Sequence, residues 1–142
     1  YITTDSIEQL SINNIYLPYV NINNYLIEKF KKLEFYHYNT VLINKIVSVN
    51  NSDSCHCFIE NADLKILIIE NGEIFYFNSF SYKTLDDILY YTLLVINDKS
   101  FKNKNIPINI HAGKKIDEIK VKFNNFIKNI SVIKNNNFAQ VL

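Results

Sequence analysis

The sequence predicts a mixed α/β fold whose clearest part runs strand, strand, strand, helix, strand, helix, strand. Between residues 55 and 80, apolar side chains occur in short alternating or β-branched runs, as strands require. Asn71-Gly72 separates two of these runs with residues that tolerate positive φ, which is typical of a tight hairpin. After residue 83 the apolar positions recur every three or four residues, which is the helical period.

The first three strands of this series are predicted from their apolar runs. They cover residues 55–59, 64–69 and 74–80. Every side chain between residues 66 and 69 is apolar. Because successive side chains of a strand point to opposite faces, both faces of this sheet are expected to be buried.

A helix is predicted to follow, starting at Thr84 and ending near residue 97. Thr84 and Asp87 have the spacing of an N-terminal capping box, and Asp86 adds negative charge favourable to the helix dipole. A strand at residues 106–111 comes next, followed by an amphipathic helix over residues 116–130. A short strand at residues 131–133 completes the series.

The first fifty residues have weaker patterns. A strand is expected at residues 12–17, stopped by the proline that follows, and a helix at residues 22–33. Residues 35–38 are expected to be extended. Residues 40–47 fit either a helix or a buried strand, and the helix is favoured.

Composition excludes several classes of protein. The chain has 15 basic residues, all lysine, against 14 acidic ones, which gives a net charge of +1. Neither a nucleic-acid partner nor membrane insertion is expected from this balance and from such short apolar runs. The 142 residues include no Met, so the chain is expected to be a fragment or a processed product. With only two cysteines, a cytoplasmic location is expected.

Two clusters contain residue types found in catalytic or metal sites. Cys55-His56-Cys57 contains zinc-binding residue types, but in a strand His56 would point away from the two cysteines, so buried core positions are favoured. A two-metal nuclease site would need four carboxylates to converge, and helix capping already explains two of them. These carboxylates are Glu60, Asp63, Asp86 and Asp87. No catalytic residue and no metal ligand is therefore expected.

Two segments carry a resemblance to a known family. Residues 71–91 contain a strand that ends in Asn-x-Phe-x-Tyr, then a Thr-x-x-Asp helix start and a Tyr-Tyr pair; residues 15–24 lie upstream. Together they resemble a bacterial family of unknown function with an actin-like ATPase fold, and this chain resembles its C-terminal half. The element order resembles the ribonuclease H-like layout of the actin, Hsp70 and sugar-kinase superfamily. The resemblance implies that residues 1–50 end a preceding lobe and that residues 51–142 form a ribonuclease H-like lobe.

The resemblance also implies where a nucleotide would bind. In the superfamily, the hairpin between the first two strands carries an acidic residue followed by Gly and Thr, which admit nucleotide phosphate. The corresponding residues here include Glu60, Asn61 and Asp63, but no Gly, and Leu64-Lys65 replace the expected small hydroxyl residues. These three residues are weak candidates for a cofactor site, and an ordinary polar turn is favoured.

The function expected from the sequence is that of a non-catalytic module with an actin-like fold that binds protein partners or serves as a scaffold. No cofactor is expected under this hypothesis. The alternative is a nucleotide-binding ATPase whose first lobe is absent from this chain, and only this alternative requires ATP and Mg²⁺. The sequence leaves the biological process and the oligomeric state open.

Overall fold

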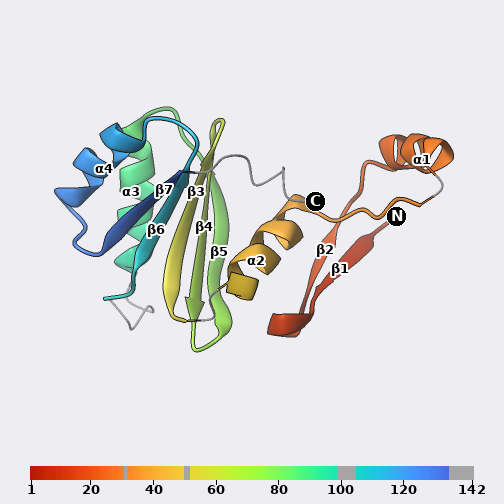
Figure 1. Ribbon diagram of the computed structural model, residues 1–142, viewed down its shortest axis with the longest axis horizontal. Helices are drawn as coiled ribbons and strands as arrows, with labels where there is room; N and C mark the ends of the chain where they lie inside the picture. The colour runs from red at the N-terminus through yellow and green to blue at the C-terminus, as the bar shows by residue number, and fades with distance from the viewer. Residues whose placement is uncertain (31, 50–51, 99–104, 135–142) are drawn as a thin grey trace. The chain divides into compact units, whose positions relative to one another are not determined.

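The computed structural model describes residues 1–30, 32–49, 52–98 and 105–134 (Figure 1). The chain divides into two compact units, Tyr1–Asn51 and Ser52–Leu142, which are described separately below.

The second unit is built on a five-stranded sheet with the strand order β5-β4-β3-β6-β7. The first three strands in sequence pair antiparallel, and β6 pairs parallel with both β3 and β7. With helices α3 and α4 between β5, β6 and β7, this confirms the predicted β-β-β-α-β-α-β order. The strands are β3 (Ser54–Glu60), β4 (Asp63–Glu70), β5 (Glu73–Ser81), β6 (Ile108–Ala112) and β7 (Ile130–Lys134).

The predicted hairpin turn between β4 and β5 is present. Asn71 and Gly72 both have positive φ, 55° and 77°. Two consecutive positive values match the right-handed twist of the strands that such a turn joins. The turn between β3 and β4 uses Asn61 at φ 51° for the same purpose, so asparagine serves there in a left-handed position.

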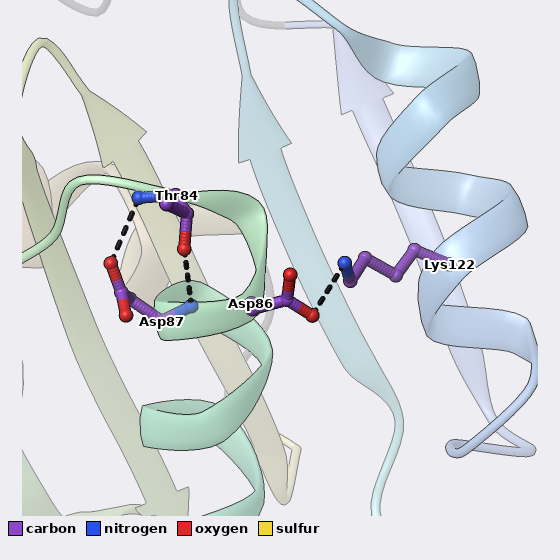
Figure 2. Close-up of polar contacts among 4 residues, drawn as sticks. All are labelled: Thr84, Asp86, Asp87 and Lys122. Carbon is purple, nitrogen blue, oxygen red and sulfur yellow. Dashed lines mark hydrogen bonds and ion pairs between the residues drawn. The ribbon is translucent and has the colours of Figure 1, made fainter.

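Helix α3 (Leu85–Ile96) begins at the predicted capping box (Figure 2). The Asp87 amide donates to Thr84 Oγ1 at 3.2 Å, and the Thr84 amide donates to Asp87 Oδ2 at 2.8 Å. A second amide, from Lys83, also donates to Asp87 Oδ2 at 2.9 Å. The amides of Lys83 and Thr84 lower the pKa of Asp87, because they stabilise its charged form.

Helix α4 (Ile116–Asn124) is shorter than predicted. The stripe expected over residues 116–130 was wrong at its end, because Ile130 begins β7 and Phe126 is 63% exposed. The helix ends at Asn124 because the residues from Ile130 onward form β7, which pairs parallel with β6. On its surface, Lys122 pairs with Asp86 of α3 (Figure 2).

Helices α3 and α4 lie on one side of the five-stranded sheet (Figure 1), and together they form its main core. Residues of both helices pack there against alternate side chains of the central strands, including Cys55, Cys57 and Ile110. The other face of these strands also carries buried side chains, Phe58 and Leu67 among them. Both faces are therefore buried in the centre of the sheet, as predicted.

The first unit contains a two-stranded antiparallel sheet, a short 3₁₀ helix and two α-helices. Strand β1 was not predicted, and α1 ends earlier than expected because Phe30 is already extended. The extended segment expected at residues 35–38 was wrong at Tyr38, which begins α2, and residues 35–37 belong to no helix or strand. The helix favoured for residues 40–47 is confirmed. The elements are β1 (Thr3–Ile7), η1 (Glu8–Leu10), β2 (Ile12–Tyr16), α1 (Val20–Lys29) and α2 (Tyr38–Val49).

A buried carboxylate holds the first unit together. Asp5 is 5% exposed, and its Oδ2 accepts hydrogen bonds from the His37 amide at 2.6 Å and from Thr40 Oγ1 at 2.8 Å. Its Oδ1 accepts from Tyr16 Oη at 3.0 Å. One side chain of β1 thus joins β2 to the start of α2, where backbone amides would otherwise lack acceptors.

In the described part of the chain, no helix combines the length and the hydrophobicity needed to cross a bilayer.

Replacing Asp5 with Ala should destabilise the first unit, because three donors would lose their acceptor in a buried place. We expect the free energy of unfolding to fall by about 2–4 kcal/mol. Tyr16→Phe, which removes one of the three donors, should cost only about 1 kcal/mol. Urea unfolding measures both values. Equal losses in the two variants would contradict the central role of the carboxylate.

Thr84→Ala should cost about 1 kcal/mol, because the amide of Asp87 loses its acceptor at the start of α3. Thr84→Ser keeps an acceptor oxygen at the same position and serves as the matched control. Thermal unfolding followed by circular dichroism measures both variants. The capping assignment fails if serine is as destabilising as alanine.

Candidate functional site

The three candidate residues Glu60, Asn61 and Asp63 lie at the tip of the β3–β4 hairpin. Glu60 is the cross-strand partner of Asp63, so the turn between them consists of only two residues, Asn61 and Ala62. Asn61 adopts the left-handed conformation that this tight turn requires. The candidates are together because they are neighbours in sequence.

Tyr82, just after β5, holds this turn from the adjacent strand. Its hydroxyl donates to the carbonyl of Asn61 at 2.7 Å, and its amide donates to the carbonyl of Ala62 at 3.0 Å. Partial burial raises the pKa of the Tyr82 hydroxyl, and the negative charge of Asp63 raises it further. Both carbonyls of the turn are therefore committed to one residue. This contact could not be predicted from sequence, because it depends on the pairing of β4 with β5.

The surroundings of the turn are acidic. Carboxylates at Glu60 and Asp63 face each other across the hairpin and disfavour an anionic group there. The next position, Leu64, is fully buried in the core and offers no polar group to a ligand. Lys65 lies opposite Phe58 on β3 and Ser79 on β5, further along the sheet.

The same two carboxylates are the groups that could hold a cation at this turn. Mg²⁺ prefers six oxygen ligands, and often takes one or two carboxylates together with substrate phosphates. Among the described residues, no three His, Cys, Asp or Glu side chains are grouped as a metal site. Asp86 and Asp87 instead pair with Lys122 and cap α3, so the carboxylates weighed for nuclease chemistry do not converge.

The Cys55-His56-Cys57 segment lies in β3 and alternates as predicted. Both thiols are fully buried on the side of α3, where the sulfur of Cys57 lies 3.8 Å from Thr92 Oγ1. A hydrogen bond to Cys57 and burial both raise the pKa of the Cys55 thiol well above its usual value. Neither thiol thus has the exposed, electropositive environment that makes cysteine reactive.

His56 points to the opposite face, where it meets a second histidine. Its Nδ1 lies 3.0 Å from His111 Nε2, and its Nε2 lies 3.1 Å from Ser54 Oγ. Phe58 stacks on the His111 ring with centroids 4.6 Å apart. The contact between the two histidines could not be predicted from the sequence, because it requires the parallel pairing of β3 with β6. The pair is buried and forms a hydrogen-bonded chain with Ser54 on this face of the sheet.

Burial lowers the pKa of His56 to about 4, whereas an unfolded histidine takes up a proton near pH 6.5. Between these pH values the unfolded state binds more protons, so acidification should reduce stability by up to about 3 kcal/mol. His56→Gln should lose this part of the pH dependence, measured as urea-unfolding free energies at pH 7, 5.5 and 4.5. Phe58→Leu, which removes no titratable group, should keep it. The assignment is wrong if His56→Gln and the wild type have the same pH dependence.

Comparison with solved structures identifies the fold. The crystal structure of a Bacteroides thetaiotaomicron protein with an actin-like ATPase fold and unknown function matches 94% of this chain, with a TM-score of 0.78 and 18% identity. The chain spans about half, 53%, of that protein. An AlfA filament bound to AMPPNP matches 65% of this chain and 35% of its own, with a TM-score of 0.47 and 15% identity. No curated protein matches the sequence.

Comparison with protein families agrees with the resemblance seen in the sequence. Residues 1–130 match DUF3822, a family described as a protein of unknown function. The Bacteroides neighbour confirms the actin-like ATPase fold that the sequence predicted. The match includes both compact units and every described element up to the start of β7. The chain therefore belongs to the DUF3822 family and has an actin-like fold.

Proposed function

We propose that this chain is a non-catalytic module of an actin-like fold that acts by binding other proteins. The observation that carries the proposal is the two-residue β3–β4 turn, where the cross-strand partners Glu60 and Asp63 place two carboxylates beside the backbone amides. In the superfamily that the sequence resembles, this hairpin is where nucleotide phosphate would lie. Here the hairpin is a tight two-residue turn flanked by two carboxylates.

Backbone cradles for phosphate need small residues, so that amide groups can approach the anion. Asn61 and Ala62 both carry side chains at this turn, and Asn61 already occupies the left-handed position. Glu60 and Asp63 add negative charge on either side. The side chains at the turn and the negative charges beside it therefore both disfavour binding of a triphosphate.

Exposed apolar side chains favour protein as the partner. On the second unit, Tyr90 and Leu94 lie one turn apart on α3 and are 61% and 52% exposed. Val121 and Phe126, in and after α4, are 69% and 63% exposed. Large exposed apolar residues that are neighbours on one surface, as Tyr90 and Leu94 are on α3, are typical of contact surfaces. We place this activity in the cytoplasm, where the two free cysteines, both buried, would stay reduced.

A nucleotide-binding ATPase is the competing function. Its best support is the facing pair Glu60 and Asp63, which could share a Mg²⁺ ion with the phosphates of ATP. The first lobe of such an enzyme would lie outside this chain.

Calorimetry and thermal unfolding of the natural full-length protein with 0–5 mM Mg-ATP separate the two functions. We expect no saturable heat and no rise in Tm, because the turn offers no phosphate site. A ligand at about 100 times its Kd would instead stabilise the protein by about 2.7 kcal/mol, which is readily detected.

Variants decide whether any stabilisation comes from this turn. The proposal is overturned if saturable, Mg²⁺-dependent stabilisation occurs and is abolished in Glu60→Gln/Asp63→Asn. The matched control is Asp117→Asn in the first turn of α4, which removes a carboxylate from another element.

A further inference from the structure

The first unit carries an apolar surface that its own described residues leave largely exposed. Helix α1 has no buried residue at all. The apolar surface of the first unit is defined here as the large apolar residues from β2 to the end of α1, each between 40% and 80% exposed. They are Ile15, Leu17, Tyr19, Val20, Ile22, Tyr25, Ile27 and Phe30.

These residues occupy more than one side of α1. Ile22 and Tyr25 are three positions apart and share one side of the helix, while Val20 and Ile27 are seven apart and share another. A helix on the surface of a finished domain has one apolar stripe and one polar face. A helix that is apolar on several sides is normally buried. In α1, however, Ile22, Tyr25 and Ile27 are 57%, 60% and 53% exposed.

The small sheet of this unit also leaves apolar residues exposed and strand edges unpaired among the described residues. Strands β1 and β2 pair only with each other, and the described residues add no third strand to them. A two-stranded sheet is marginal in water without further strands or a packed face. Ile15 on β2 is 65% exposed, and Leu17, just beyond it, is 76% exposed.

The comparison with the Bacteroides protein indicates what covers this surface. The match extends over 94% of this chain, so it includes most of the first unit. It leaves nearly half of the Bacteroides chain without a counterpart, since only 53% of that chain is covered. A protein of the same fold thus contains a large additional segment beside the part represented here.

We infer that the apolar surface of the first unit packs against a further segment of the same polypeptide, equivalent to the unmatched part of the Bacteroides protein. The contact is apolar, because the surface has few charges apart from Glu28 and Lys29 near the end of α1. Strand β1 or β2 pairs there with a strand of that segment. The inference does not depend on whether the protein binds nucleotide.

Hydroxyl-radical footprinting of the natural full-length protein, read by mass spectrometry, tests this contact. Tyr25 on α1 and Tyr90 on α3 are matched probes, because their side chains are 60% and 61% exposed in this chain. We expect Tyr25 to be oxidised at least about fivefold more slowly than Tyr90, with each rate normalised to the same residue in urea. Equal normalised rates, or a faster rate at Tyr25, would overturn the inference.

Dilution distinguishes a segment of the same polypeptide from a second copy of the protein as the group that covers Tyr25. Protection by a segment of the same polypeptide is independent of protein concentration, and we expect the same rate at Tyr25 from 50 μM to 0.5 μM. Protection that disappears on dilution would mean that a second copy covers the surface, and the inference would fail. It would fail equally if the natural protein had no residues outside this chain.

A pair of substitutions gives an independent readout. Ile22→Lys in the full-length protein should lower Tm by several degrees, because a charge would be buried in the contact. Leu94→Lys is the matched control, since Ile22 and Leu94 are 57% and 52% exposed in this chain. If Ile22→Lys lowers Tm no more than Leu94→Lys does, the surface is not an interior contact.

Discussion

The register of β3 against β4 is the constraint on which the second unit depends. The two-residue turn at Asn61-Ala62 sets that register, and Tyr82 fixes the turn from β5 through two hydrogen bonds. A shift of one residue would exchange the two faces of the strand. Cys55 and Cys57 would then leave the core under α3, and His56 would enter it. In a nucleotide-binding relative this hairpin would bind phosphate; in this chain its two carbonyls accept hydrogen bonds from Tyr82.

Much of the second unit could be predicted because its signals are local. The Asn71-Gly72 turn and the Thr84–Asp87 capping box each lie within four residues, and both formed as expected. Local periodicity was less reliable where the sheet imposes its own requirement. The helical spacing of apolar residues in α4 continues in the sequence as far as Ile130. In the structure, however, Ile130 begins β7, the edge strand that pairs parallel with β6.

Contacts between distant residues could not be predicted from one sequence. Asp5 reaches Thr40 across 35 positions, and His56 reaches His111 across 55. Nothing in the local pattern around Asp5 indicates a buried carboxylate, and β1 itself was missed. At the candidate site, the residues at the turn were identified from sequence, but the role of Tyr82 was not. Its contact exists only once β5 is paired with β4.

The two units differ in how completely they bury their apolar residues. The second has a core filled from both helices and the sheet, whereas α1 of the first has no buried residue. This contrast accompanies a match that covers only 53% of the Bacteroides protein. The apolar surface of the first unit therefore bears on how the fold itself is completed. The exposed residues of α3 and α4 bear on which partners the protein binds.

The most direct measurement of the central claim is an NMR titration of the full-length protein, ¹⁵N-labelled, with Mg-ATP. The account predicts that the amide signals of Asn61, Ala62 and Asp63 stay in place throughout, because the carboxylates of Glu60 and Asp63 disfavour a phosphate at this turn. Saturable shifts centred on these three amides would contradict it.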